Sequence, residues 1–329
     1  MSRSAKAPVR AGTVLASARH VLGGDLMRGA RADLKLVSRG FRWGRGQLVP
    51  RSAEPYVVTK PKPPFPTAWA RTPAMNVVRE GVQRLGLGPL LRSEVQPDVH
   101  GLDLLERMGR RSVVFVANHS SHMDTPLILC SLPADWRRRT AVAAAADYFF
   151  DTWWRATGSA VVFNTFPIER RGGTLSSTPG DLLTSGWNIV VYPEGTRSPD
   201  GWMRQFRLGA AYLAKQYDVA VVPVGIRGSF AAMPRGRGWP VPGRPPVTVR
   251  FGEPLYPSAD EGVRQLGARI ESAVAELVDE DADTWWEAKR RAATGRTPST
   301  SGPQVAQWRR VWAQTESPRL PGHPKIWHR

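Results

Sequence analysis

The stretch VVFVANHSSHMD, residues 113–124, joins an apolar run to a short polar segment that contains two histidines and an aspartate. Residues 113–117 have the Val- and Phe-rich composition of a buried β-strand. Asp124-Thr125-Pro126 is typical of a helix start, with Asp124 as N-cap and proline in the first turn. His119 and His122 are therefore expected in a loop at the carboxyl end of a strand, where α/β proteins place their functional sites.

Short runs rich in Val, Ile and Phe recur along the chain and alternate with helical stretches. The runs lie at 113–118, 160–166, 188–192, 219–226 and 247–252. FRLGAAYLAKQY, residues 206–217, is one of the helical stretches between them. This alternation predicts an α/β domain with a mostly buried mixed sheet covered by helices.

A helical pattern opens this domain at TPAMNVVREGVQRLG, residues 72–86. Thr72 suits the N-cap, Pro73 suits the first helical position, and Gly86 is expected to end the helix. The helix has an apolar stripe that could face either the core or lipid, formed by Met75, Val78, Val82 and Leu85. The pattern predicts an amphipathic helix at the start of the domain.

A second helical pattern closes the domain at SADEGVRQLGARIESAVAELV, residues 258–278. Ser258 and Glu261 have capping-box spacing there. We expect three parts: a basic, Pro-rich N-terminal arm at 1–72, the α/β domain at 73–280, and a Trp/Arg-rich tail at 281–329. The arm ends in KPKPPFP, residues 60–66, which is typical of a stiff extended spacer.

The whole-chain composition limits the classes of partner. The 46 Lys and Arg against 28 Asp and Glu give a formal charge of +18, which favours polyanions: nucleic acid, an anionic membrane face, or phosphorylated and CoA-bearing substrates.

One cysteine, Cys130, excludes an internal disulfide and any Cys-rich metal site. No apolar run approaches the roughly 18 residues of a spanning helix, and no signal core is present, so we expect a cytoplasmic protein.

His119, His122 and Asp124 allow three interpretations. They could be metal ligands, although the remaining histidines lie outside the central motifs. They could be a structural pair. In the third interpretation, which we favour, Asp124 accepts a hydrogen bond from one ring nitrogen of His119 and leaves the other nitrogen free to take a proton from a hydroxyl.

Four sequence blocks, each at or just after an expected strand, narrow this choice. They are NHSSHMD (118–124), FPIERR (166–171), YPEGTRS (192–198) and VAVVPVGIRGS (219–229). Together they resemble the glycerolipid (1-acylglycerol-3-phosphate) acyltransferase family, over roughly residues 73–280. In FPIERR, Pro167 and Glu169 stand where many members carry Ile and Asp, which weakens the inference of a strict lysophosphatidate preference.

The resemblance implies an enzyme of phospholipid synthesis. It would move a fatty acyl chain from acyl-CoA or acyl carrier protein to the free hydroxyl of a lysophosphatidate-like lipid. His119 would act as general base and Asp124 would orient it, with no acyl-enzyme, so that Ser120 and Ser121 are not nucleophiles. No cofactor and no metal are expected beyond the acyl donor itself.

The resemblance also implies that the acceptor's phosphate is held by a group that we call the phosphate clamp, comprising Arg170, Glu194, Gly195, Thr196 and Arg197. Arginine offers forked donors that suit a phosphate, glycine lets backbone N–H groups come close, and threonine adds a hydroxyl. Ion pairs of Arg170 with Glu169 and of Arg197 with Glu194 are the structural alternative. For Glu194, an ordering role in the loop is favoured over direct substrate contact.

Three aromatic segments suggest how the chain meets its substrate. DYFFDTWWRATG (147–158) suits either a core helix or an interfacial element, and TWWEAKRR and QWRRVWAQ in the tail suit a phospholipid surface or stacked bases. We expect peripheral binding to the cytoplasmic face of a membrane through anionic lipid. The alternatives are a non-catalytic or nucleic-acid-binding basic protein, which no recognisable binding motif supports, and an acyltransferase for a different lysolipid acceptor.

Overall fold

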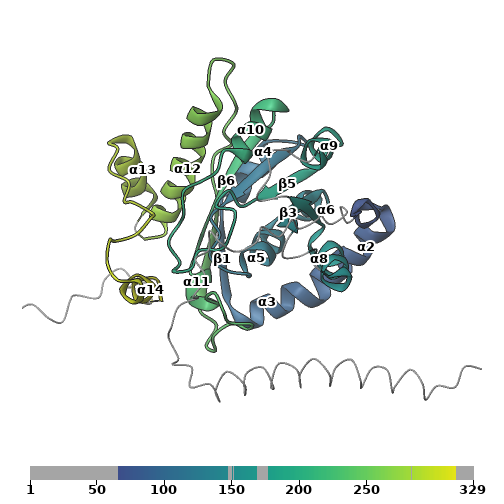
Figure 1. The fold of residues 1–329 in the computed structure, drawn as a ribbon, viewed down its shortest axis with the longest axis horizontal. Helices are drawn as coiled ribbons and strands as arrows, with labels where there is room; N and C mark the ends of the chain where they lie inside the picture. Colours follow the sequence, from purple (N-terminus) through teal and green to yellow (C-terminus); the bar gives the residue numbers. More distant parts are fainter. Residues whose placement is uncertain (1–65, 147–149, 151, 169–176, 283, 316–329) are drawn as a thin grey trace, which may run out of the picture. The chain divides into compact units, whose positions relative to one another are not determined.

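Strand β2 (Val113–Ala117) is the central strand of the sheet (Figure 1). The computed structural model describes residues 66–146, 150, 152–168, 177–282 and 284–315. Within these residues seven strands form one sheet, in the order β1-β7-β6-β2-β5-β3-β4. Only the pairing of β6 with β7 is antiparallel. The expected mixed α/β sheet is confirmed.

The remaining elements alternate along the chain with the strands. The other strands are β1 (Gln96–His100), β3 (Thr140–Ala145), β4 (Thr165–Ile168), β5 (Asn188–Val191), β6 (Ala220–Arg227) and β7 (Pro246–Phe251). The helices are η2 (Ala68–Arg71), α2 (Pro73–Gly81), η3 (Val82–Leu87), α3 (Gly88–Glu94), α4 (Leu102–Arg107), α5 (Asp124–Ser131), α6 (Ala134–Arg138), α8 (Trp153–Phe163), α9 (Thr178–Thr184), α10 (Gly209–Gln216), α11 (Ser229–Ala232), α12 (Val263–Glu280), α13 (Trp285–Ala293) and α14 (Gln307–Thr315).

Both faces of β2 are buried, because helices cover the sheet on each side. Val113 and Phe115 belong to a core cluster with apolar residues of α5. Val114 and Val116 belong to a second cluster with residues of α10 and α12. Alternate residues of a strand point to opposite faces, so this one five-residue strand contributes to both halves of the core. A continuous apolar run, rather than an alternating one, is the pattern that such burial requires.

The predicted strand at 160–166 is wrong over most of its length. Residues up to Phe163 continue α8, and strand β4 begins only at Thr165. Asn164 separates the two elements with a left-handed backbone, φ 54°, and its side-chain amide donates to Thr140 O. Val161 and Val162 resemble a strand in sequence, but their carbonyls accept hydrogen bonds from Arg79 and Gln83 of the neighbouring helical segment. These tertiary contacts satisfy the end of a helix that local propensity disfavours.

The Val-, Ile- and Phe-rich runs did not predict two of the strands. Strand β1, with the sequence QPDVH, lies at the sheet edge with alternating exposure, and β3 is TAVAAA. Proline and aspartate are rare in strands, and alanine favours helices, so neither segment has strong strand propensity. Their pairing with β7, β4 and β5 determines their conformation instead.

Three predicted helix boundaries need correction. Gly86 does not end the first helix, because η3, a π-helical turn, carries it on into α3. Ser258 and Glu261 form no capping box: α12 begins at Val263, and the N–H of its N-cap Gly262 donates to Gln265 Oε1 at 2.7 Å. Met123, not Asp124, is the N-cap of α5, and Asp124 is its first helical residue.

The first helical segment has its polarity reversed relative to an ordinary surface helix. Arg79 and Gln83 are buried, whereas Val77, Val78 and Leu85 are exposed. The apolar stripe expected in this segment therefore does not face the core. Thr72 and Pro73 do occupy the expected N-cap and first helical position.

The segments flanking the domain are described only in part. The N-terminal arm lies outside the described residues, apart from the part that begins at residue 66. In the tail, α13 packs against α12, and residues 298–315 contain α14. No helix in the described part of the chain has the length and apolar character needed to cross a membrane.

Candidate active site

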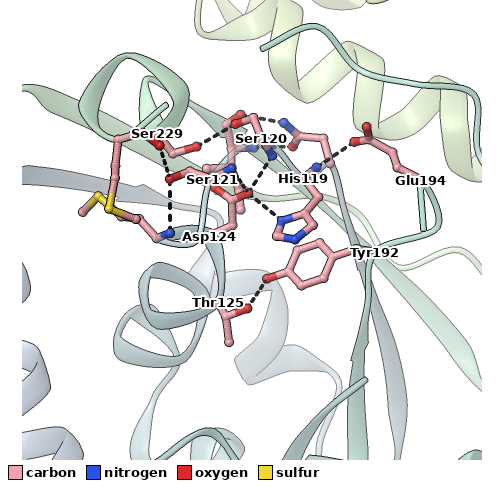
Figure 2. A network of polar contacts seen from close by, with 12 residues as sticks. His119, Ser120, Ser121, Asp124, Thr125, Tyr192, Glu194 and Ser229 are labelled. Carbon is pink, nitrogen blue, oxygen red and sulfur yellow. Dashed lines mark hydrogen bonds and ion pairs between the residues drawn. The ribbon is translucent and has the colours of Figure 1, made fainter. Parts of the chain in front are cut away.

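His119 and Asp124 meet at the carboxyl end of β2. His119 Nδ1 lies 2.8 Å from Asp124 Oδ2, and the aspartate is completely buried (Figure 2). The same oxygen accepts the N–H groups of Ser120 at 2.8 Å and Ser121 at 2.9 Å. Since the oxygen of a carboxylate only accepts, this arrangement assigns the proton at Nδ1 to the bond with Asp124 and leaves Nε2 as the ring nitrogen open to a substrate.

Neighbouring side chains of the loop attach it to strand β6 and helix α11. Asn118 pairs with the backbone of Ile226 in both directions, each bond 2.8 Å long. Ser120 Oγ lies 3.0 Å from Ser229 Oγ, and Ser121 Oγ donates to Met233 O at 2.8 Å. Both serine hydroxyls are buried and engaged in these bonds. Neither arrangement is that of an activated nucleophile, because each of these bonds joins the hydroxyl to another hydroxyl or to a backbone carbonyl and not to a base.

Tyr192 is a site residue that sequence reasoning did not single out. Its ring stacks on the His119 imidazole, with centroids 4.0 Å apart and planes 20° apart, and its hydroxyl lies 2.9 Å from Thr125 Oγ1 (Figure 2). Burial raises the pKa of the Tyr192 phenol well above its usual value, so it stays neutral. Tyr192 opens the YPEGTRS block directly after β5, and the parallel pairing of β5 with β2 is what places it beside His119.

Glu194 holds the loop that carries His119. Its side chain is buried; Oε1 accepts the His119 N–H at 2.7 Å, and Oε2 accepts the Arg204 N–H at 3.0 Å. Burial raises the pKa of this carboxyl to about 8, although both backbone N–H groups act in the opposite direction. The geometry agrees with the expected ordering role and connects the YPEGTRS loop to the His119 backbone.

A cavity of about 420 Å³ lies in front of His119. From the phosphate clamp, Gly195, Thr196 and Arg197 line it; Glu194 does not. Arg170 lies outside the described residues, so its predicted place in the site stays a prediction. Much of the remaining wall is apolar and comes from the ends of α8, β3 and β4, including Val142, Phe163 and Ile168, and Arg235 adds a cation that the sequence blocks did not indicate.

Gly195 is needed for the shape of the loop. It has φ +72°, and a Cβ atom there would lie 3.1–3.4 Å from the guanidinium of Arg207. Three residues later, the Ser198 N–H donates to the His119 carbonyl at 2.8 Å. The loop that carries Arg197 is thus bonded directly to the loop that carries His119.

His122 lines the same cavity but is not part of the His119–Asp124 pair. Burial, followed by the proximity of Arg197 and His119, lowers the pKa of His122 to about 4. The ring is therefore neutral at neutral pH. Among the described residues, no group of three or more His, Cys, Asp or Glu side chains is arranged to hold a metal ion.

Comparison with known proteins gives consistent matches for this part of the chain. Residues 96–227 match the family model described as Acyltransferase. The chain is 30% identical over 155 residues to a 1-acyl-sn-glycerol-3-phosphate acyltransferase of Chlamydomonas reinhardtii, covering 46% of this chain and 45% of the relative. It is 36% identical over 154 residues to one of Limnanthes alba, covering 44% of this chain and 51% of that protein. These alignments span about half the length of each relative.

Among solved structures, the chain is similar to the 1-acyl-sn-glycerophosphate (LPA) acyltransferase PlsC from Thermotoga maritima. The TM-score is 0.49 at 26% sequence identity, covering 63% of this chain and 84% of that one. His119, Asp124 and residues 192–198 all lie inside the region that the family model matches, whereas α12, α13 and α14 lie outside it.

Proposed function

We propose that this chain transfers a fatty acyl group from a thioester to the free hydroxyl of a lysophosphatidate-like lipid, since residues 96–227 match the family model described as Acyltransferase. The observation that carries this proposal is the buried His119–Asp124 pair, which opens onto a cavity that also contains Arg197. A base and a cation in one cavity suit an acceptor that has both a hydroxyl and a phosphate.

In this mechanism His119 activates the acceptor. Nε2 takes the proton of the hydroxyl while the hydroxyl oxygen attacks the thioester carbonyl carbon; proton transfer of this kind contributes about 10²–10⁴-fold. Asp124 holds the tautomer and stabilises the imidazolium that forms. The new C–O bond gives a tetrahedral intermediate. When it collapses, the C–S bond breaks, and the leaving thiolate recovers the proton from His119.

Direct transfer needs no acyl-enzyme. The Ser120 hydroxyl is bonded to Ser229 Oγ, and the Ser121 hydroxyl donates to the Met233 carbonyl. Stacking against Tyr192 and the hydrogen bond that Nδ1 donates to Asp124 fix the imidazole in two directions. A fixed base increases the fraction of bound acceptor that is correctly oriented.

The acceptor's phosphate is proposed to bind at Gly195, Thr196 and Arg197, with Arg170 as a further contact. Arg197 lines the cavity with His119, and the bond from the Ser198 N–H to the His119 carbonyl ties its loop to the base. Phosphate binding there would place the neighbouring hydroxyl of the same small molecule near Nε2. Glu194 acts by holding the loop and not by touching the phosphate, which it would repel when ionised.

We propose that the lipid enters from an exposed apolar surface on α2, η3 and α8. Val77 is 72% exposed, Leu85 84% and Trp153 75%, and α2 lies against α8. The far end of α8 reaches the cavity at Phe163. Arg155 lies 5.1 Å from the Trp154 ring, a pairing that suits the headgroup layer. The chain would bind the cytoplasmic face of a membrane peripherally, through this surface, the basic arm and the tail.

The test is acyl transfer by purified protein. Lysophosphatidate with an acyl-CoA should release free CoA and produce the diacyl lipid, measured with a thiol reagent and by mass spectrometry. The assay should be repeated with acyl carrier protein as the donor's carrier. Acyl transfer by neither donor to any lysolipid, together with tight RNA binding that falls steeply with salt, would favour the nucleic-acid-binding alternative.

A panel of acceptors separates the acceptor classes. Lysophosphatidate and glycerol 3-phosphate carry a phosphate monoester, whereas choline-bearing and neutral lysolipids do not. Preference for lysophosphatidate supports the role given to Arg197. A preference for choline-bearing or neutral acceptors would favour the alternative of a different lysolipid, to which the FPIERR sequence also points.

A further inference from the structure

The loop after Arg197 is attached to the C-terminal segment, residues 298–315, which lies outside the region matched by the family model. Asp200 is the centre of the attachment. Its Oδ2 accepts from Arg310 Nε at 2.6 Å, and its Oδ1 accepts from Ser198 Oγ at 3.0 Å and from the Trp202 N–H at 3.3 Å. The Asp200 side chain is 11% exposed, and both of its oxygens accept hydrogen bonds that hold this turn.

The guanidinium of Arg310 holds the C-terminal segment in place at the same time. Its two terminal nitrogens donate to Pro303 O and Ser301 O, each at 2.7 Å. One side chain therefore fixes the turn at 301–303 and the Asp200 carboxylate together. A planar fork of donors can do this, whereas an ammonium group cannot match all three directions at once.

Two further contacts connect the same segments through the backbone. The Trp202 indole donates to Arg310 O at 3.1 Å, and the Met203 N–H donates to Thr300 O at 3.0 Å. Gly302 has φ +78°, and a Cβ atom there would lie 2.3 Å from the Trp202 ring. The turn at 301–303 therefore lies directly against the ring.

A short path leads from Arg310 to the active site. Asp200 holds Ser198, whose N–H donates to the His119 carbonyl, and Arg197 is the preceding residue. A second cavity of about 250 Å³ lies along this contact and is lined by Asn118 and Ser120 as well as by Thr300 and Gln314. The C-terminal segment thus reaches the back of the His119 loop.

We propose that Arg310 is a positioning residue for acceptor binding: by bonding Asp200, the C-terminal segment fixes the Ser198–Met203 loop and with it the guanidinium of Arg197. The inference rests on the proposed function, because it assigns Arg197 to the acceptor. On this proposal, the tail contributes to acceptor binding. Trp308 and Trp312, on the same helix α14, are exposed, so α14 joins a surface suited to lipid with a loop that contacts the substrate.

The first test is kinetic. Arg310→Gln should raise the KM for lysophosphatidate about tenfold, with kcat and the acyl-CoA KM within about twofold of wild type. Asp200→Asn should have a similar effect, and the double variant should be no worse than either single one, because both remove the same bond. Arg310→Lys should restore part of the loss. The control is Arg264→Ala, which removes the same charge from the exposed surface of α12 and should change nothing.

The second test needs no substrate. In Arg310→Gln, peptides covering 196–206 should exchange their amide hydrogens at least several-fold faster, whereas peptides covering β2 should be unchanged. If the wild type proves inactive towards lysolipids, the proposed function fails while this measurement still decides whether the tail fixes the loop. Unchanged exchange at 196–206 and an unchanged acceptor KM would overturn the inference. Should Arg310→Gln not fold, the Arg310→Lys and Asp200→Asn proteins decide the same two readouts.

Discussion

The loop at 118–124 and the helical segments α2, η3 and α8 both bury polar side chains. In the loop the buried groups support an active-site ring, whereas in the helical segments they leave apolar side chains exposed. In the loop, Asp124 accepts backbone N–H groups and also pairs with His119. In the helical region, Arg79 and Gln83 donate to carbonyls of α8. The first arrangement points a reactive ring at a cavity, and the second leaves apolar side chains facing outward.

The two regions should therefore respond differently to single substitutions. Every polar atom that supports His119 sits in a fixed geometry, so replacing one of them should change the chemical step. The exposed side chains of α2 and α8 share their contribution over a broad surface, so replacing one or two should change binding only moderately. The following predictions test this contrast, beginning with the largest effect.

Removing the base should have the largest effect on turnover. His119→Ala should abolish measurable turnover, and Asp124→Asn should lower kcat by about 10²-fold or more, because the proton acceptor or its orientation is lost. Steady-state kinetics and circular dichroism together check this. A matched control is available in His100, which lies 2.8 Å from Asp98 on the exposed edge strand β1; His100→Ala should have no effect. A folded His119→Ala protein with near-normal turnover would refute the mechanism.

Removing the cation should affect acceptor binding more than chemistry. Arg197→Ala should raise the acceptor KM at a cost of about 1.5–3 kcal/mol, the value of a charge-assisted hydrogen bond, and should leave the donor KM nearly unchanged. Arg197→Lys should be only a partial rescue, because it lacks the fork. Kinetics with each substrate varied separately give the answer. Equal effects on both substrates would indicate a structural ion pair instead.

His122 lies in the same loop as His119 and lines the same cavity, but a different effect is expected from it. Its pKa falls from 6.5 to about 4 on folding, so between these values the unfolded chain binds more protons and stability falls as pH falls. The loss should be about 1–2 kcal/mol after allowance for the ring's partial exposure. Urea unfolding at pH 7 and pH 4.5 should show a smaller acid loss in His122→Gln, whose turnover at neutral pH should be only mildly reduced. An identical acid loss in both proteins would refute this assignment.

The exposed surface should give the smallest effects. Replacing Trp153 and Trp154 together by Ala should lower binding to anionic vesicles about threefold to tenfold, in the part of binding that survives moderate salt. Removal of residues 1–62 should lower the salt-sensitive part instead. Cosedimentation at two ionic strengths measures both. Tyr256→Ala, an exposed aromatic on another part of the domain, is the control. Equal losses for Tyr256→Ala would mean that the α2–α8 surface has no special role.

Local sequence was sufficient to predict the central strand and the loop and helix that follow it. The strand at 113–117, the loop after it and the helix from 124 follow from apolar continuity and helix-start chemistry. The spacing of His119 and Asp124 allows their pairing within one turn of chain. The same local reasoning was wrong for 160–166, where contacts with Arg79 and Gln83 decided the conformation, and for Gly86, where the helix continues through a π-helical turn.

The sequence by itself determined the alternation of strands and helices, the loop that holds the histidine, and the strong positive charge. The tertiary structure alone decided that Tyr192 stacks on His119, that Glu194 holds its backbone, and that Arg310 reaches Asp200. The reason is that a parallel sheet gathers the carboxyl ends of strands far apart in the chain at one edge, in an order that periodicity does not encode. The outward face of α2 is decided likewise, by the carbonyls that Arg79 and Gln83 find on α8.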